Sequence, residues 1–175
     1  IITPQHISYM PGGTAYYFSR GMASLHALTG YKLITALGSK EYPVVDELRK
    51  AGIDIDVLPS RHTVYFENRY GENSDNRTQR VLAKADPFTI DALHKENARF
   101  FHLGSLLADD FPPEVIKYLS GKAILSVDAQ GYLREVKGDK VSPIDWPEKR
   151  EILKYIENVT CNMDSATKDT MVNAP

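Results

Sequence analysis

Apolar side chains recur along the first part of the chain at the spacings of a helix and of a buried strand. After Gly13 they fall every three or four positions, at Ala15, Phe18, Met22 and Leu25. This repeat predicts a helix that begins directly after Gly13 and buries these side chains. The apolar run at residues 32–37 is short and continuous, which is typical of a buried strand.

The next segment predicts a second helix and a second strand. Pro43 suits the first turn of a helix, and Val45 and Leu48 share the face that would point inward. Gly52 then marks the end of this helix, because glycine is the residue that most often follows a helix. Residues 53–59 follow as another strand.

The same alternation returns in the second half of the chain. Helical spacing is found at residues 87–97, from 113 onward and at 147–157, and strands are expected at 99–104, 122–128 and 158–162. Strands that alternate with helices favour crossover connections and a parallel sheet. We therefore expect an α/β fold, a mostly parallel sheet flanked by helices, with residues 1–175 in a single domain.

Residues 63–82 interrupt this alternation. Two segments with no helical repeat flank the polar turn GENSD, which predicts a β-hairpin inserted into the α/β chain. An insertion rich in polar groups is expected to project from the sheet rather than to lie within it.

Composition narrows the classes of protein. A chain of 175 residues with 42% hydrophobic residues is long enough for a real core, and a net charge of -2 gives no basic surface for nucleic acid. No apolar run approaches the roughly 18 residues of a membrane span, and the start of the chain lacks the pattern of a signal peptide. With one cysteine, Cys161, no internal disulfide is possible, so a soluble cytoplasmic protein is expected.

The glycine pair Gly12 and Gly13 precedes the first expected helix. Glycine lets a ligand approach the main chain, and the first turn of a helix offers unpaired N–H groups. The pair belongs to neither a Walker phosphate loop nor a G-x-G-x-x-G dinucleotide motif. A tight turn with nothing bound is the alternative.

The stretch SVDAQGYLR places a carboxylate and a guanidinium after an apolar strand. Asp128 can accept hydrogen bonds from hydroxyl groups, and Arg134 can pair with a carboxylate or a phosphate. Two plainer interpretations are equally open, in which Asp128 only caps a turn and Arg134 is a solvated surface charge.

The other polar residues give weaker indications of a functional site. Asp109 and Asp110 precede two prolines, so capping of the following helix is favoured over catalysis. The five histidines and Cys161 share no metal-ligand spacing. Aromatic residues near the helix start and the hairpin can stack on a ring, although a place in the core is the commoner outcome: Tyr16, Tyr17 and Tyr65.

In their order, these features resemble the PfkB or ribokinase-like family of carbohydrate and nucleoside kinases. The matching features are PGGTA before a helix, a hairpin after the second strand, HLG before another helix and the loop SVDAQGYLR. The resemblance covers the chain from Met10 to about Asn162. It implies a ribokinase-like fold in which the hairpin at about 63–82 is a lid over the substrate.

The resemblance also implies roles for individual residues. The glycine turn with Thr14, polar and aromatic side chains of the lid, and the Asp128 loop would contact a sugar or nucleoside, and Asn162 would lie near the phosphates and magnesium. The expected substrate-binding residues are Gly12, Gly13, Thr14, Tyr65, Glu67, Asn68, Arg77, Arg80, Asp128 and Arg134. The lid is also expected to pair with that of a second copy in a homodimer.

Parts of the family pattern have no match in this chain. The Gly-Ala-Gly-Asp motif, whose Asp is the catalytic base, is absent, and the Gly138–Asp139 pair lies in a charged turn. A glutamate of the magnesium region would fall at Ser165, and the sugar-binding Asp of the first strand would precede Ile1. We expect a partial domain without the C-terminal nucleotide-binding part.

The resemblance therefore predicts that the parent protein uses ATP and Mg2+ to phosphorylate a sugar or nucleoside hydroxyl. This chain would supply the substrate-binding half and the lid, and would be inactive by itself. The alternative is a non-catalytic module that binds a sugar or dimerises, as a degenerate or truncated kinase. An unrelated nucleotide-binding α/β protein is a third possibility, which the missing phosphate motifs weaken.

Overall fold

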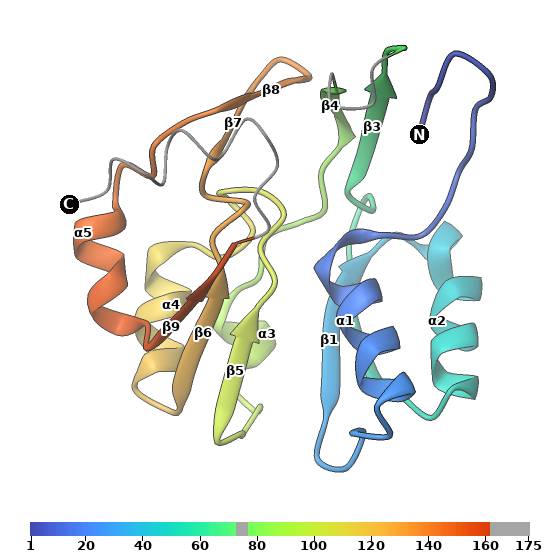
Figure 1. Ribbon diagram of the computed structural model, residues 1–175. Helices are drawn as coiled ribbons and strands as arrows, with labels where there is room; N and C mark the ends of the chain where they lie inside the picture. The colour runs from blue at the N-terminus through green and yellow to red at the C-terminus, as the bar shows by residue number, and fades with distance from the viewer. Residues whose placement is uncertain (73–76, 162–175) are drawn as a thin grey trace. The chain divides into compact units, whose positions relative to one another are not determined.

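In a computed structural model of the protein, residues 1–72 and 77–161 are described (Figure 1). The chain divides into two units, Ile1–Asp86 and Pro87–Pro175, called here the first and the second unit. The expectation that residues 1–175 form a single domain stays a prediction.

The first unit contains two main helices, two parallel strands and an antiparallel hairpin. Its elements in chain order are α1 (Gly13–Ser24), β1 (Lys32–Leu37), the 3-10 turn η1 (Ser39–Glu41), α2 (Tyr42–Lys50), β2 (Asp54–Pro59), β3 (Tyr65–Tyr70) and β4 (Arg77–Ala83). β1 has the bounds that the sequence predicts. β1 and β2 pair in parallel, with Leu33 opposite Ile55.

The core of the first unit forms where α2 covers the inward face of β1 and β2. Val45 and Leu48 of α2 are buried against Leu33, Ile53 and Ile55, as the sequence predicts for the two helix residues. Burial of such side chains contributes roughly 1.5 to 3 kcal/mol each. Behind α2 the backbone turns at Gly52, where φ is 87°. This left-handed conformation explains the glycine that ends the helix.

α1 packs through only part of the face that the sequence predicts. Phe18 and Leu25, expected inward, are 42% and 76% exposed, so the prediction is wrong for both. Ala15 lies against the core as predicted, together with Tyr16 and Ala23, and Ser19 is fully buried.

The hairpin begins directly after the parallel pair. β3 and β4 are antiparallel, and their register shifts between Tyr65 and Phe66. The chain start runs beside β3: the Ile2 N–H donates to the Asn68 carbonyl at 2.8 Å, and the Tyr70 N–H donates to the Ile2 carbonyl at 2.9 Å. An antiparallel pair is therefore confirmed within the predicted range, and Ile2 adds a short partner to its β3 side.

The second unit contains a parallel sheet, one longer helix and a second hairpin. Its elements are α3 (Ile90–Leu93), β5 (Phe100–Leu103), α4 (Pro113–Ser120), β6 (Ile124–Asp128), β7 (Arg134–Lys137), β8 (Lys140–Pro143), α5 (Lys149–Ile152), the 3-10 turn η2 (Leu153–Tyr155) and β9 (Asn158–Thr160). The helices expected at 87–97 and 147–157 are much shorter than predicted. The antiparallel hairpin β7–β8, which turns at Gly138, was not predicted.

The sheet of the second unit has two faces of different character. β6 lies between β5 and β9 with all three strands parallel. Leu125 and Val127 of β6 are fully buried on one face, and α4 packs on this sheet through Ile116 and Leu119. Because side chains alternate along a strand, the other face carries Ser126 and Asp128.

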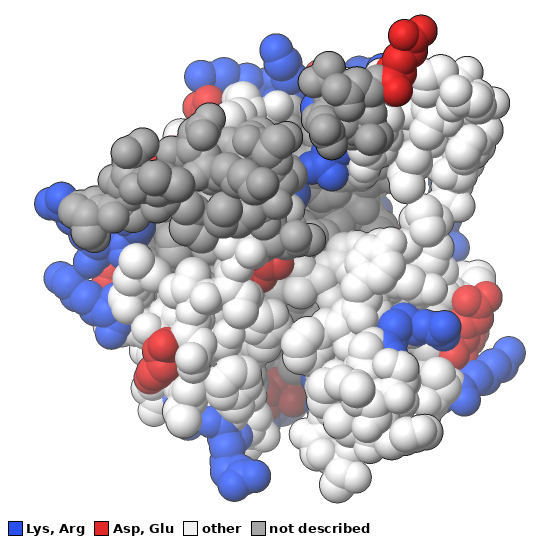
Figure 2. Space-filling view, in the orientation of Figure 1, with Lys and Arg blue, Asp and Glu red and all other residues white. Residues whose placement is uncertain are grey.

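Two surface properties complete the fold. No helix within residues 1–72 and 77–161 is long and apolar enough to cross a membrane. On the face shown in Figure 2, the Lys and Arg side chains of the described residues stand singly or in small groups among uncharged ones.

Candidate functional site

The glycine turn at the start of α1 contains two glycines with different conformations. Gly13 has φ 80°, a left-handed conformation that disfavours any side chain. Gly12 is extended, with φ −162°, which any residue adopts. A Cβ added to Gly12 would lie 3.7 Å from the nearest described atom, Cε2 of Tyr17, an ordinary contact. Backbone strain therefore explains Gly13, whereas nothing in the described chain explains the glycine at position 12.

The hairpin residues expected to bind substrate lie on two different faces. Asn68 pairs with Gln79, and the Gln79 amide donates to the Asn68 side-chain oxygen at 2.7 Å. Glu67 pairs with Arg80 on the opposite face, where its carboxylate lies 3.5 Å from the Arg80 guanidinium. Arg77 pairs with Tyr70 and so shares the Asn68 face. The structure thus separates Asn68 and Arg77 from Glu67 and Arg80.

The three aromatic candidates also separate. Tyr16 packs against the core of the first unit, as the plainer interpretation predicted. Tyr17 and Tyr65 are 58% and 41% exposed. Desolvation, followed by the nearby Tyr9 and the Glu67 carboxylate, raises the pKa of Tyr65.

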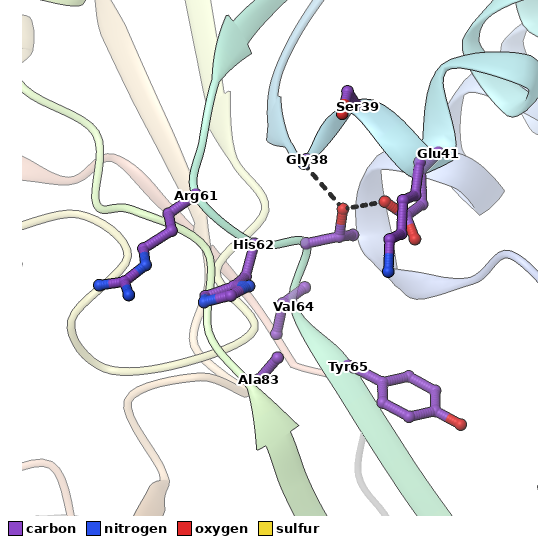
Figure 3. A pocket seen from close by; sticks show the side chains of 10 residues that line it. Gly38, Ser39, Glu41, Arg61, His62, Val64, Tyr65 and Ala83 are labelled. Carbon is purple, nitrogen blue, oxygen red and sulfur yellow. Dashed lines mark hydrogen bonds between the residues drawn. The ribbon is translucent and has the colours of Figure 1, made fainter.

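A cavity of about 310 Å³ lies in the first unit near the ends of β1 and β2 (Figure 3). It is lined by residues 38–41 and 61–65 together with Ala83. Thr63 links its two walls, because its hydroxyl accepts from the Gly38 N–H at 2.9 Å and donates to the Glu41 carboxylate at 2.6 Å. Arg61 and Tyr65 point in opposite directions in Figure 3. Of the predicted substrate residues, only Tyr65 lines this cavity.

Two loops of the second unit are fastened together at the ends of β5 and β6. The Arg134 guanidinium donates to the Leu106 carbonyl at 3.2 Å. A Cβ added to Gly131 would overlap Ser105 Oγ and lie 2.8 Å from the Leu107 nitrogen, closer than real Cβ atoms come. Gly131 is therefore required by the approach of residues 105–107. Arg134 is half-buried, so the interpretation as a solvated surface charge is wrong.

Asp110 and Tyr132 strengthen this contact. The Asp110 carboxylate accepts hydrogen bonds from the N–H groups of Leu106 and Leu107, at 2.7 and 3.0 Å. The helix α4 instead has Pro112 at its N-cap and no side-chain cap, so the prediction of helix capping by the aspartate pair is wrong. The Tyr132 hydroxyl donates to the Phe111 carbonyl at 3.1 Å, and burial strongly raises the pKa of Tyr132.

Asp128 lies at the end of β6, only 8% exposed. Its carboxylate accepts from the Gln130 N–H at 3.0 Å, which is the turn-capping role that the sequence left open. Two residues earlier, the Ser126 hydroxyl lies 3.0 Å from Nδ1 of His102 on β5. Burial lowers the pKa of His102, and the negative charge of Asp128 opposes part of that effect. His102, which sequence reasoning tested only as a metal ligand, is thus part of a polar group with Ser126 and Asp128.

Solved structures resemble this chain over most of its length. A pyrophosphate-dependent kinase in the ribokinase family, solved with sulfate, is 30% identical over 90% of this chain, with a TM-score of 0.77. Such a kinase complexed with a pyrophosphate analogue and myo-inositol is 28% identical over 91% of this chain, with a TM-score of 0.80. The chain has a ribokinase-like fold.

A third structure of the same kind extends the comparison. It is a pyrophosphate-dependent myo-inositol-1 kinase converted into a myo-inositol-3 kinase by two substitutions, 27% identical over 88% of this chain, with a TM-score of 0.70. This ribokinase-like chain spans 51% to 56% of the length of the three structures. No protein-family model and no curated protein matches it.

The fold confirms the resemblance to the ribokinase family, and the individual site residues stay predictions. Asn162, expected near the phosphates, lies outside the described residues. Within residues 1–72 and 77–161, no group of three or more His, Cys, Asp or Glu side chains is placed to hold a metal ion.

Proposed function

We propose that the protein carrying this chain transfers a phosphoryl group to a hydroxyl of a sugar or cyclic polyol. The observation that supports this is the likeness to three solved kinase structures at 27% to 30% identity. Two of those kinases are described with myo-inositol as a bound molecule or in their activity. A ring that carries several hydroxyls is therefore the acceptor class that we propose.

The contribution of this chain is to bind and orient the acceptor. Phosphoryl transfer depends mainly on positioning and on stabilisation of charge, so a binding half is a substantial part of the catalyst. Gly12 leaves the main chain open to a ligand, and the Asp128 carboxylate is an acceptor for ring hydroxyls. Thr14 and, on one face of the hairpin, Asn68 and Arg77 are proposed to complete the contacts.

The phosphoryl donor is the second part of the proposal. The family resemblance implied ATP, whereas all three solved relatives are named as pyrophosphate-dependent. We propose pyrophosphate as the donor, with ATP as the alternative that the assay decides. The base and the donor site are expected outside this chain, because its sequence lacks the Gly-Ala-Gly-Asp motif.

The test uses the purified natural protein that contains this sequence. Pyrophosphate and ATP are each supplied with myo-inositol, with a set of sugars and with a nucleoside, and phosphorylated product is detected by 31P NMR. We expect product from pyrophosphate and a cyclic polyol or sugar. Product from ATP alone would overturn the proposal that pyrophosphate is the donor. Binding of the acceptor without product from either donor would favour the non-catalytic module.

The 175-residue chain by itself gives a second test. It is expected to bind the acceptor weakly and to form no phosphorylated product with either donor. Product formed by this chain in a clean preparation would show that the missing motif is not needed. Homodimerisation through the hairpin also stays a proposal, and because Ile2 already pairs with β3 at residues 68–70, a partner strand would have to use another part of the hairpin.

A further inference from the structure

In the second unit, the polar and ionisable side chains His102, Ser126 and Asp128 lie on one face of the parallel sheet. Because parallel partners point to the same side, the register places Ser126 between His102 and Asn158, and Asp128 beside Thr160. Ser126 is 4% and Asp128 is 8% exposed. The opposite face, with Leu125 and Val127, is fully apolar. A titratable ring thus lies on the same face as a buried carboxylate.

His102 is connected to Asp128 through one residue of β6. Its Nδ1 lies 3.0 Å from Ser126 Oγ, and Ser126 stands two positions before Asp128 on the same face. A neutral ring can accept a hydrogen bond from the Ser126 hydroxyl, whereas a protonated ring must donate one to it. A change of charge on His102 therefore turns the Ser126 hydroxyl and alters the field at Asp128.

The charges around His102 identify Asp128 as its partner. On β6 the charged group on the same face is the Asp128 carboxylate, and β9 adds the uncharged Asn158 and Thr160. Burial lowers the pKa of His102 and the Asp128 charge raises it, so the two side chains interact electrostatically. By reciprocity, protonation of His102 must change the properties of the Asp128 carboxylate by the same free energy.

We propose that His102 is a positioning residue for Asp128, an inference that rests on the proposed function. A neutral His102 ring lets the Asp128 carboxylate accept a hydrogen bond from the acceptor hydroxyl, and a protonated ring competes with that hydroxyl. Binding of the acceptor then weakens in mild acid through His102.

The first measurement follows the His102 ring directly, in the natural protein with labelled histidines, by NMR. The pH range extends below the ordinary histidine pKa of about 6.5, because burial lowers the pKa of His102. The variant Asp128→Asn keeps an oxygen for the Gln130 N–H and removes the charge. We expect the His102 pKa to fall in this variant, since an opposite charge favours the protonated ring. An unchanged His102 pKa would overturn the inference, whether or not any acceptor binds.

The second measurement is the affinity for myo-inositol at about pH 7.5 and about pH 5, by calorimetry. We expect the wild-type affinity to fall about tenfold and that of His102→Gln about threefold or less, because one pK unit of coupling equals a factor of ten. The matched control His94→Gln changes an exposed ring of the second unit and should behave as the wild type. His102→Asn serves if the glutamine variant fails to fold, as judged by circular dichroism.

The outcomes separate this inference from the proposed function. If the wild type binds myo-inositol and its affinity falls between the two pH values by the same factor as that of His102→Gln, only this inference is overturned. No binding of myo-inositol or of any sugar by the wild type at either pH would overturn the proposed acceptor class and this inference with it.

Discussion

Gly131 and Gly12 are glycines for different reasons. At Gly131 in the second unit, the space of a side chain is already filled by Ser105 and Leu107 of the same chain. At Gly12 in the first unit, an added Cβ would make only an ordinary contact with Tyr17. A glycine that its own chain explains is evidence about packing, whereas one that its chain leaves unexplained is evidence about a ligand.

The largest expected effect is at Gly131. In Gly131→Ala the new methyl group must displace the buried Ser105 hydroxyl or the backbone of residues 106–107, so we expect a loss of about 3 kcal/mol in the free energy of unfolding. Denaturant titration followed by circular dichroism measures it. Gly121→Ala is the control, because its Cβ would lie 3.4 Å from the nearest atom. Equal loss in both variants would mean that the two loops do not pack as described.

A smaller effect is expected at Gly13. Its φ of 80° places alanine in the left-handed region, so Gly13→Ala should cost about 1 to 2 kcal/mol of stability. Gly13→Asn tolerates this conformation better and should lose less than the alanine variant. Thermal unfolding of the two variants gives the order, and an equal or reversed order would show that backbone strain does not explain Gly13.

The smallest effect on stability is expected at Gly12, together with a clear effect on binding. Gly12→Ala should change stability by less than about 0.5 kcal/mol, as at an unstrained surface site. Its methyl group would stand where we propose that the acceptor approaches, so the affinity for myo-inositol should fall at least about tenfold, equivalent to about 1.4 kcal/mol. Calorimetric titration measures the affinity for myo-inositol of the natural protein and of its Gly12→Ala variant.

The control for Gly12 lies on the same helix. Gly21→Ala in α1 meets no atom within 4 Å and should stabilise the protein by about 0.5 to 1 kcal/mol without changing affinity. If Gly12→Ala binds as tightly as Gly21→Ala, the ligand interpretation of Gly12 fails and a plain turn remains.

The sequence was sufficient where local patterns decide the structure. β1 and the inward face of α2 follow from short apolar runs and from Pro43 and Gly52. The face of α1 followed only in part: Ala15 lies against the core as predicted, whereas hydrophobicity also favours Phe18, which is exposed, over the small Ala23, which lies against the core. The hairpin β7–β8 was missed because its strands are mostly polar, although the KGDK turn was visible in the sequence.

Some residues of the candidate site could likewise be predicted from local sequence patterns, and others could not. Asp128 and Arg134 could be found because they lie in one short loop after one strand. The contact of Arg134 with Leu106 spans 28 positions, and the pairing of His102 with Ser126 spans 24. Contacts of that kind depend on strand register and on how two loops meet, which no local pattern encodes.

The stacked pair Tyr132 and Trp146 offers a practical signal. Their ring centroids lie 4.2 Å apart with an angle of 16° between the planes, and Trp146 is 5% exposed. Trp146 is the one tryptophan of the sequence. Tryptophan emission therefore reports on the second unit alone, while far-ultraviolet circular dichroism reports on helices of both. Comparing the two optical signals during unfolding shows directly whether the halves of the chain melt as one cooperative body.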